Sequence, residues 1–134
     1  MRAQTAFEYM VIAIIILAFL TPMWLYVSQV QNESAEGLSL TYAKNAVKKI
    51  AENADLVYSQ RLGAKVKVGI YIPRGVEEIN ITGKTVIMRI YSSSGAVDIF
   101  ETSTADLNGT LPTTSGFHWV MIEAKGDYVQ ISKL

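Results

Sequence analysis

An apolar stretch without a polar face runs from Tyr9 to Val27, near the start of this 134-residue chain. About 19 residues at about 1.5 Å each form a helix of roughly 27–29 Å, which is long enough to cross the hydrocarbon core of a bilayer. A helix on the surface of a soluble core would need a polar side. We therefore expect this helix to be covered all round, either by lipid or by copies of itself. Pro22, which softens or kinks one turn, is tolerated in both settings.

Glu8 stands at the beginning of this stretch and is its one acidic side chain before Asn32. A carboxylate in an apolar setting costs several kcal/mol to desolvate unless it meets a cation. We therefore expect Glu8 to have a cationic partner. The simpler alternative is that its charge only limits how deeply the helix sinks into a membrane.

Two common explanations of an apolar N-terminal segment account poorly for these residues. A secretory signal peptide has a shorter apolar region followed by a small-residue cleavage site. Here the apolar run is long, and Ser28–Glu33 is a poor cleavage site. A plain membrane anchor explains the apolar character but gives no reason for Glu8.

The residues around Glu8 form a recognisable pattern. The chain reads Arg2-Ala3 and then Gln4-Thr5-Ala6-Phe7-Glu8-Tyr9 before the apolar run. This pattern resembles the class III signal sequence of archaeal type IV pilins, with Ala6 where serine is common. In that family a prepilin peptidase removes a short basic leader on the cytoplasmic side of the membrane. The resemblance implies cleavage between Ala3 and Gln4.

The resemblance also implies roles for Gln4, Glu8 and Tyr9 in filament assembly. Removal of residues 1–3 would give Gln4 a free ammonium group and make Glu8 the fifth residue of the mature chain. Among packed helices, Glu8 could then pair with the N-terminus of a neighbouring subunit. A register error would leave both ions unpaired, so the pair would set the axial register more than it adds stability.

Residues 28–63 are expected to continue as an amphipathic helix. Small and apolar residues recur at three- and four-residue steps, at Ala43, Val47, Ile50, Ala54 and Val57. The charged residues fall largely on the other side and are interpreted as a solvated face: Lys44, Lys48, Lys49, Glu52 and Asp55. Gly37 could loosen the helix, and Gly63 is the expected C-cap.

Residues 64–134 are expected to form a β-rich head. Apolar patterns bounded by turn residues predict strands at 65–72, 76–81, 85–92, 96–102, 117–124 and 127–133. Asp106 to Gly116 is expected to be the longest loop. The predicted fold is α+β, a long N-terminal helix followed by an antiparallel sheet or small sandwich. Its expected organisation is a leader at 1–3, a helix at 4–63 (apolar at 4–27, amphipathic at 28–63) and the head at 64–134.

Three Asn-x-Ser/Thr sequons begin at Asn32, Asn80 and Asn108. All three are expected in turns or polar linkers, where a glycan acceptor is accessible. We expect at least one of them to be glycosylated.

Four aromatic residues of the head, Tyr71, Tyr91, Trp119 and Tyr128, have two possible roles. Packing in the core or between subunits is favoured, and an aromatic sugar-binding surface is the alternative.

Other functional classes find little support in the sequence. The chain has no cysteine and one histidine, His118, so thiol catalysis and a histidine-rich metal site are excluded. Lys plus Arg and Asp plus Glu are both 12, so no net charge recruits nucleic acid. No phosphate-binding loop, nucleophile elbow, zinc-binding helix or calcium loop is present. We expect no enzymatic activity, no cofactor and no metal.

The predicted function is therefore structural. By resemblance, the chain is a subunit of an archaeal type IV-like pilus, inserted in the cytoplasmic membrane and then extracted into an extracellular filament for adhesion. Its partners would be its own copies, the prepilin peptidase, and an assembly platform with its ATPase. The alternative is a single-pass membrane anchor that displays a β domain for a sugar or a protein partner.

Overall fold

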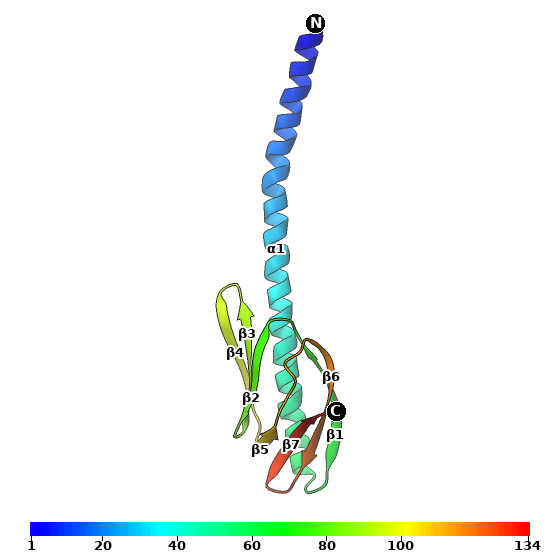
Figure 1. Cartoon of the computed structure of the whole chain (residues 1–134), viewed down its shortest axis with the longest axis vertical. Helices are drawn as coiled ribbons and strands as arrows, with labels where there is room; N and C mark the ends of the chain where they lie inside the picture. Colours follow the sequence, from blue (N-terminus) through cyan, green and yellow to red (C-terminus); the bar gives the residue numbers. More distant parts are fainter. The chain divides into compact units, whose positions relative to one another are not determined.

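The computed structural model describes residues 1–134, which form one helix followed by seven strands (Figure 1). The elements are α1 (Arg2–Ser59), β1 (Lys65–Ile72), β2 (Val76–Thr82), β3 (Thr85–Ser92), β4 (Gly95–Thr102), β5 (Asp106–Gly109), β6 (Gly116–Ala124) and β7 (Tyr128–Lys133). This order confirms the predicted α+β class. The chain divides into two compact units, Met1–Gly37 and Leu38–Leu134. We call the first the stem and the second the head, so from here on the head includes the last part of α1 as well as the strands.

The helix is continuous in secondary structure through Pro22 and Gly37. Pro22 lacks the N–H that would bond one turn back. Next to it, Thr21 Oγ1 donates a hydrogen bond of 2.8 Å to the carbonyl oxygen of Leu17. A hydroxyl bonded in this way to the carbonyl four residues back often bends a helix slightly.

The helix ends at Ser59, so the predicted end at Gly63 is wrong. Arg61 takes a left-handed conformation with φ of 76° and reverses the chain before the glycine is reached. Gly63 also has a positive φ, 87°, and its N–H donates to the carbonyl oxygen of Ala124 at 3.1 Å. Gly63 therefore connects the helix to the sheet and does not cap the helix.

The head contains two sheets, with strand orders β1-β6-β7-β5 and β2-β3-β4. Figure 1 shows them on two sides of the part of α1 that belongs to the head. All pairs are antiparallel except β5 and β7, which are parallel from Asp106↔Tyr128 to Gly109↔Ile131. The expected loop at Asp106–Gly116 is thus wrong for its first four residues, because strand β5 forms there by pairing with a distant segment.

The core of the head is built around the amphipathic part of α1, as predicted. Ala43, Val47, Ile50, Ala54 and Val57 are all buried. They pack with alternate residues of both sheets, such as Ile70, Ile72, Met88, Ile90, Val120, Ile122, Val129 and Ile131. Because strand side chains alternate between faces, the intervening residues of each strand point outward. Lys44, Lys48 and Lys49 are exposed, which confirms their assignment to a solvated face.

Candidate assembly site

The apolar stem has no cover within the chain. Every residue from Met1 to Val27 is exposed, including the large side chains of Phe7, Tyr9 and Trp24. The helix is long and apolar enough to cross a membrane, and none of its most apolar window is buried. So large an exposed apolar surface is not stable in water and requires lipid or protein around it.

Gln4 and Glu8 lie one helical turn apart near the start of α1. The bond between Ala3 and Gln4 lies in the exposed first turn, where Thr5 donates to the Met1 carbonyl oxygen from its backbone N–H (3.3 Å) and its hydroxyl (3.1 Å). Cleavage at this bond stays a prediction.

Glu8 makes no ion pair or hydrogen bond through its side chain. Residues 3–43 contain no Lys or Arg, so the stem beyond Arg2 has no basic side chain to offer it. Once residues 1–3 are removed, any strong cationic partner of Glu8 in an apolar medium must therefore be an N-terminal ammonium or come from another molecule.

The three sequons are exposed, but none lies in the expected turn or linker. Asn32 is within α1, Asn80 on β2 and Asn108 on β5. The polar residues after Val27 continue the helix rather than break it, and Asn80 and Asn108 are outward-facing positions of strands. The exposure was predicted correctly, and the expected turns or linkers are wrong. The helix expected at 28–63 and the strand expected at 76–81 already include Asn32 and Asn80, so only the strand at Asn108 was not predicted.

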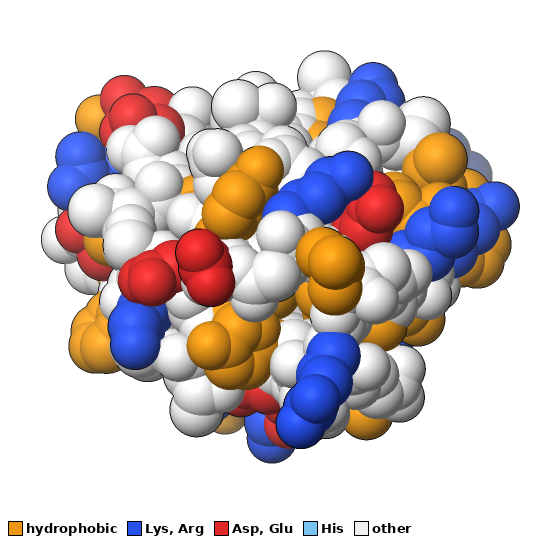
Figure 2. Space-filling model, turned by 90° about the horizontal axis from the view of Figure 1, so that it is seen from below, with side chains coloured by type: hydrophobic (Ala, Val, Ile, Leu, Met, Phe, Trp, Pro, Cys, Tyr) orange, Lys and Arg blue, Asp and Glu red, His pale blue; other side chains and the backbone are white.

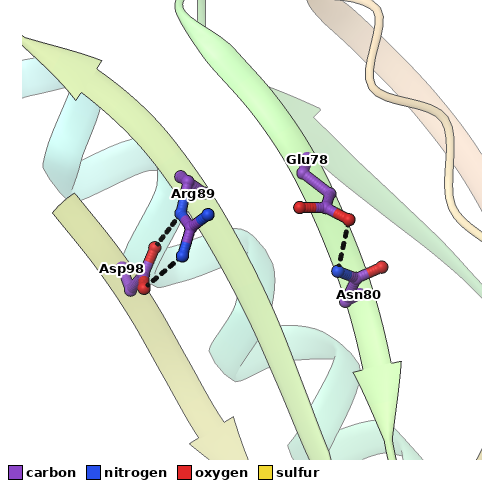
Figure 3. A network of polar contacts seen from close by, with 4 residues as sticks. All are labelled: Glu78, Asn80, Arg89 and Asp98. Atoms are coloured by element: carbon purple, nitrogen blue, oxygen red, sulfur yellow. Dashed lines mark hydrogen bonds and ion pairs between the residues drawn. The ribbon is translucent and has the colours of Figure 1, made fainter. Parts of the chain in front are cut away.

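Asn80 lies within a row of polar side chains on the outer face of the β2-β3-β4 sheet (Figure 3). Its amide nitrogen donates to Glu78 Oε1 at 2.5 Å. Arg89 binds both carboxylate oxygens of Asp98, at 2.7 and 3.0 Å. The hydrogen bonds from Arg89 hold the pKa of Asp98 below its ordinary value of 3.8. Glu78 has no ion pair of its own.

A second polar cluster ties α1 to the connection between β4 and β5. Asp55 accepts hydrogen bonds from the hydroxyls of Ser103 (2.5 Å) and Thr104 (2.9 Å) and from the backbone N–H of Thr104 (2.8 Å). Ser103 is only 3% exposed, and its own hydroxyl accepts the N–H of Ala105. Partial burial raises the pKa of Asp55, but these hydrogen bonds outweigh it and leave the pKa below 3.8. Asp55 therefore accepts hydrogen bonds that hold the head together. The helical pattern predicted a solvated position for it, and that prediction is wrong.

The aromatic residues of the head lie on outer faces, so packing in the core is wrong for them, and packing between subunits stays a prediction. Tyr71 and Trp119 share the outer face of β1 and β6, Tyr91 lies on the other sheet and Tyr128 begins β7; all four are partly exposed. In each case a neighbouring residue of the strand is buried, and the aromatic side chain points to the opposite face of the sheet. Lys67 Nζ lies 4.5 Å from the centre of the Trp119 ring, so one flat face of that ring is already covered.

The surface of the head is otherwise mixed in charge. Figure 2 shows Lys and Arg side chains interspersed with Asp and Glu and with separate hydrophobic side chains on the face in view. A groove of about 420 Å³ between α1 and β1 is lined by residues that include Tyr42, Lys48, Lys49 and Tyr71.

No family profile, curated protein sequence or solved structure matches this chain.

Proposed function

We propose that this chain is a pilin: a structural subunit of an archaeal type IV-like pilus that polymerises through its stem into an extracellular filament for adhesion. The observation that carries the proposal is Glu8. Glu8 is part of the Gln4–Tyr9 signal pattern and stands at the start of a fully exposed apolar helix. Its side chain has no partner within the chain. A free ammonium at Gln4 of a neighbouring subunit would supply the missing charge.

The energetics of such a filament follow from its starting point in the membrane. Lipid already covers the apolar stem, so moving it among other stems gains little further hydrophobic free energy. Close packing, the Glu8 pair and an assembly motor must then supply the net drive. In this scheme the partners are further copies of the chain, a prepilin peptidase, and an assembly platform with its ATPase. No cofactor or nucleic acid takes part.

The processing step is tested by intact-mass and N-terminal analysis of two cell fractions. We expect protein sheared from the cell surface to begin at Gln4, because polymerisation requires removal of the leader. Protein in the membrane pellet would include chains that still begin at Met1. A chain that begins at Met1 in both fractions, or never leaves the pellet, would contradict the pilin proposal.

That contrary result would favour the alternative, a membrane-anchored β domain that binds a sugar or a protein. The observation in its favour is the groove beside β1, where Tyr42 and Tyr71 lie beside the charged side chains of Lys48, Lys49 and Glu52. The two functions differ in what surrounds the stem, because an anchor remains in lipid while a pilin stem leaves it.

Glycosylation is tested in the same material. We expect sheared protein to be heavier than its sequence, because its sequons are exposed to the compartment in which glycans are attached. Replacement of the modified asparagine by glutamine should remove that added mass. Asn53→Gln is the matched control, since Asn53 is not in a sequon. A mass equal to that of the bare chain in every fraction would show that no sequon is used.

A further inference from the structure

The outer face of β1 and β6 carries a cluster that we call the aromatic–lysine face: Lys67, Tyr71, Phe117 and Trp119. Cross-strand pairing places Tyr71 beside Phe117, and Lys67 stands over Trp119. Gly69 leaves the space that the two β6 aromatics fill, because a Cβ there would collide with Phe117. Phe117 and Trp119 pack edge to face at 5.1 Å yet remain 58% and 46% exposed.

The outer face of the β2-β3-β4 sheet carries a second cluster that we call the carboxylate face: Glu78, Tyr91, Asp98 and Phe100. Phe100 and Tyr91 are 64% and 61% exposed. Arg89 is engaged by both oxygens of Asp98, which leaves Glu78 as a carboxylate without an ion pair. A hollow of about 140 Å³ lies beside it, lined by Glu78, Asn80, Ile87, Arg89 and Asp98.

The two faces are complementary in composition. Each combines exposed aromatic rings with charge, and the charge is basic on one face and predominantly acidic on the other. Apolar surface of this kind often marks an interface, and opposite charges select which surfaces meet. A carbohydrate is a less suitable occupant of the aromatic–lysine face, because Lys67 already covers one side of the Trp119 ring.

We propose that the aromatic–lysine face of one head packs against the carboxylate face of the next copy, with Lys67 of one chain pairing with Glu78 of the other. The inference rests on the proposed filament and adds to it a specific contact between heads. Two different surfaces that meet in this way form a heterologous contact, which does not close into a two-fold dimer and builds an open helical polymer when its rotation does not close into a ring.

Zero-length carbodiimide cross-linking of intact filaments tests the contact directly, because it joins an ammonium to a carboxylate only where they touch. Filaments assembled from mixed ¹⁴N and ¹⁵N chains should give an amide between Lys67 and Glu78 with one isotope on each side. The detergent-solubilised subunit should not give it. Filaments without this mixed cross-link would overturn the head contact alone, whereas failure of the wild-type chain to form filaments would overturn both proposals.

Charge reversal supplies an independent test in the full-length chain. Lys67→Glu and Glu78→Lys should each lower filament yield by about tenfold or more, since each sets like charges against each other. The double variant, with the charges exchanged, should recover to within about threefold of the wild type, because it restores the opposite-charge pair. Normal filaments from both single variants, or no recovery in the double, would contradict the pairing.

Matched controls separate this contact from a general effect of charge. Lys84→Glu and Asp127→Lys make the same exchanges at exposed positions between strands that belong to neither cluster, and their yields should stay at the wild-type level. Thermal unfolding of each variant in detergent identifies any that fails to fold.

The proposal also constrains glycosylation. Asn80 lies on the carboxylate face and donates to Glu78, so a glycan there would separate the two heads. Asn80 should be unmodified in assembled filaments, and any glycans should be found at Asn32 or Asn108. Full occupancy of Asn80 in filaments would overturn the proposed contact.

Discussion

A Glu8→Ala variant should insert into the membrane like the wild type but form about 100-fold fewer filaments, or none. The reason is that, without Glu8, the N-terminal ammonium of a neighbouring subunit is buried among apolar helices without a partner of opposite charge. Breaking a buried pair in this way costs about 3–5 kcal/mol, and every 1.4 kcal/mol is tenfold in an association constant. Filament mass in the sheared fraction is the quantity to measure, with the membrane-pellet level showing that insertion is intact.

The matched control is Glu33→Ala, which removes a carboxylate from the polar part of the stem. Glu33 is exposed and accepts a hydrogen bond from Gln29 at 3.2 Å. Because water remains available there, its loss should leave assembly nearly unchanged. Glu8→Gln should fail as Glu8→Ala does, since the amide keeps the size but loses the charge. Abundant filaments from Glu8→Ala would instead support the alternative that Glu8 only limits the depth of the helix in the membrane.

An Asp55→Ala variant should lower the stability of the head by about 2–4 kcal/mol, because three hydrogen bonds to a carboxylate are lost and the buried Ser103 hydroxyl loses its acceptor. For a domain of this size the melting temperature should fall by about 10 °C or more. The full-length chain in detergent, followed by near-ultraviolet circular dichroism, provides the measurement. Glu52→Ala is the control on the same helix: its pair with Lys48 spans 3.7 Å at an exposed site and contributes within about 1 kcal/mol.

The same interaction predicts a dependence of stability on pH. The folded-state pKa of Asp55 lies below its ordinary value of 3.8. Its carboxylate therefore stabilises the fold fully above that value, and the contribution is lost as the pH falls through 3.8 toward the folded pKa. The melting temperatures of the wild type and Asp55→Ala should differ most near pH 7 and approach each other below about pH 4. If the two melting temperatures differ equally near pH 7 and below about pH 4, the carboxylate charge is not what stabilises this contact.

Elements with a regular local pattern could be predicted from the sequence. The amphipathic part of α1 and strands such as β1 and β3 follow from the spacing of their apolar residues. β5 could not, because Asp106–Gly109 contains one apolar side chain and an Asn-Gly pair typical of a turn. It becomes a strand only by pairing with β7, and no local pattern reports a parallel partner.

Among the candidate site residues, those marked by their local sequence could also be predicted, and those that depend on distant partners could not. Glu8 is conspicuous because a charge interrupts apolar sequence, and the structure adds that no partner lies within the chain. The role of Asp55 was missed because its partners, Ser103 and Thr104, are far along the chain in a stretch that resembles a solvent-facing loop. For exposed aromatic residues such as Trp119 the sequence left core packing and packing between subunits open, because hydrophobicity alone does not distinguish a core from an uncovered face.

The order of strands in the larger sheet has a consequence for biogenesis. β1 pairs with β6, so that Lys65 meets Glu123 and Ile72 meets Gly116, and β7 then lies between β6 and β5. Both central strands of this sheet therefore come from the last part of the chain. While the ribosome is still making them, the stripe from Ala43 to Val57 can pack only against the β2-β3-β4 sheet, and its contacts with the larger sheet are missing. The head must wait for its C-terminus, and folding that joins such distant segments is slow. A newly made chain thus passes through a period in which this stripe is partly open to chaperones and proteases, and truncation before β6 would make that period permanent.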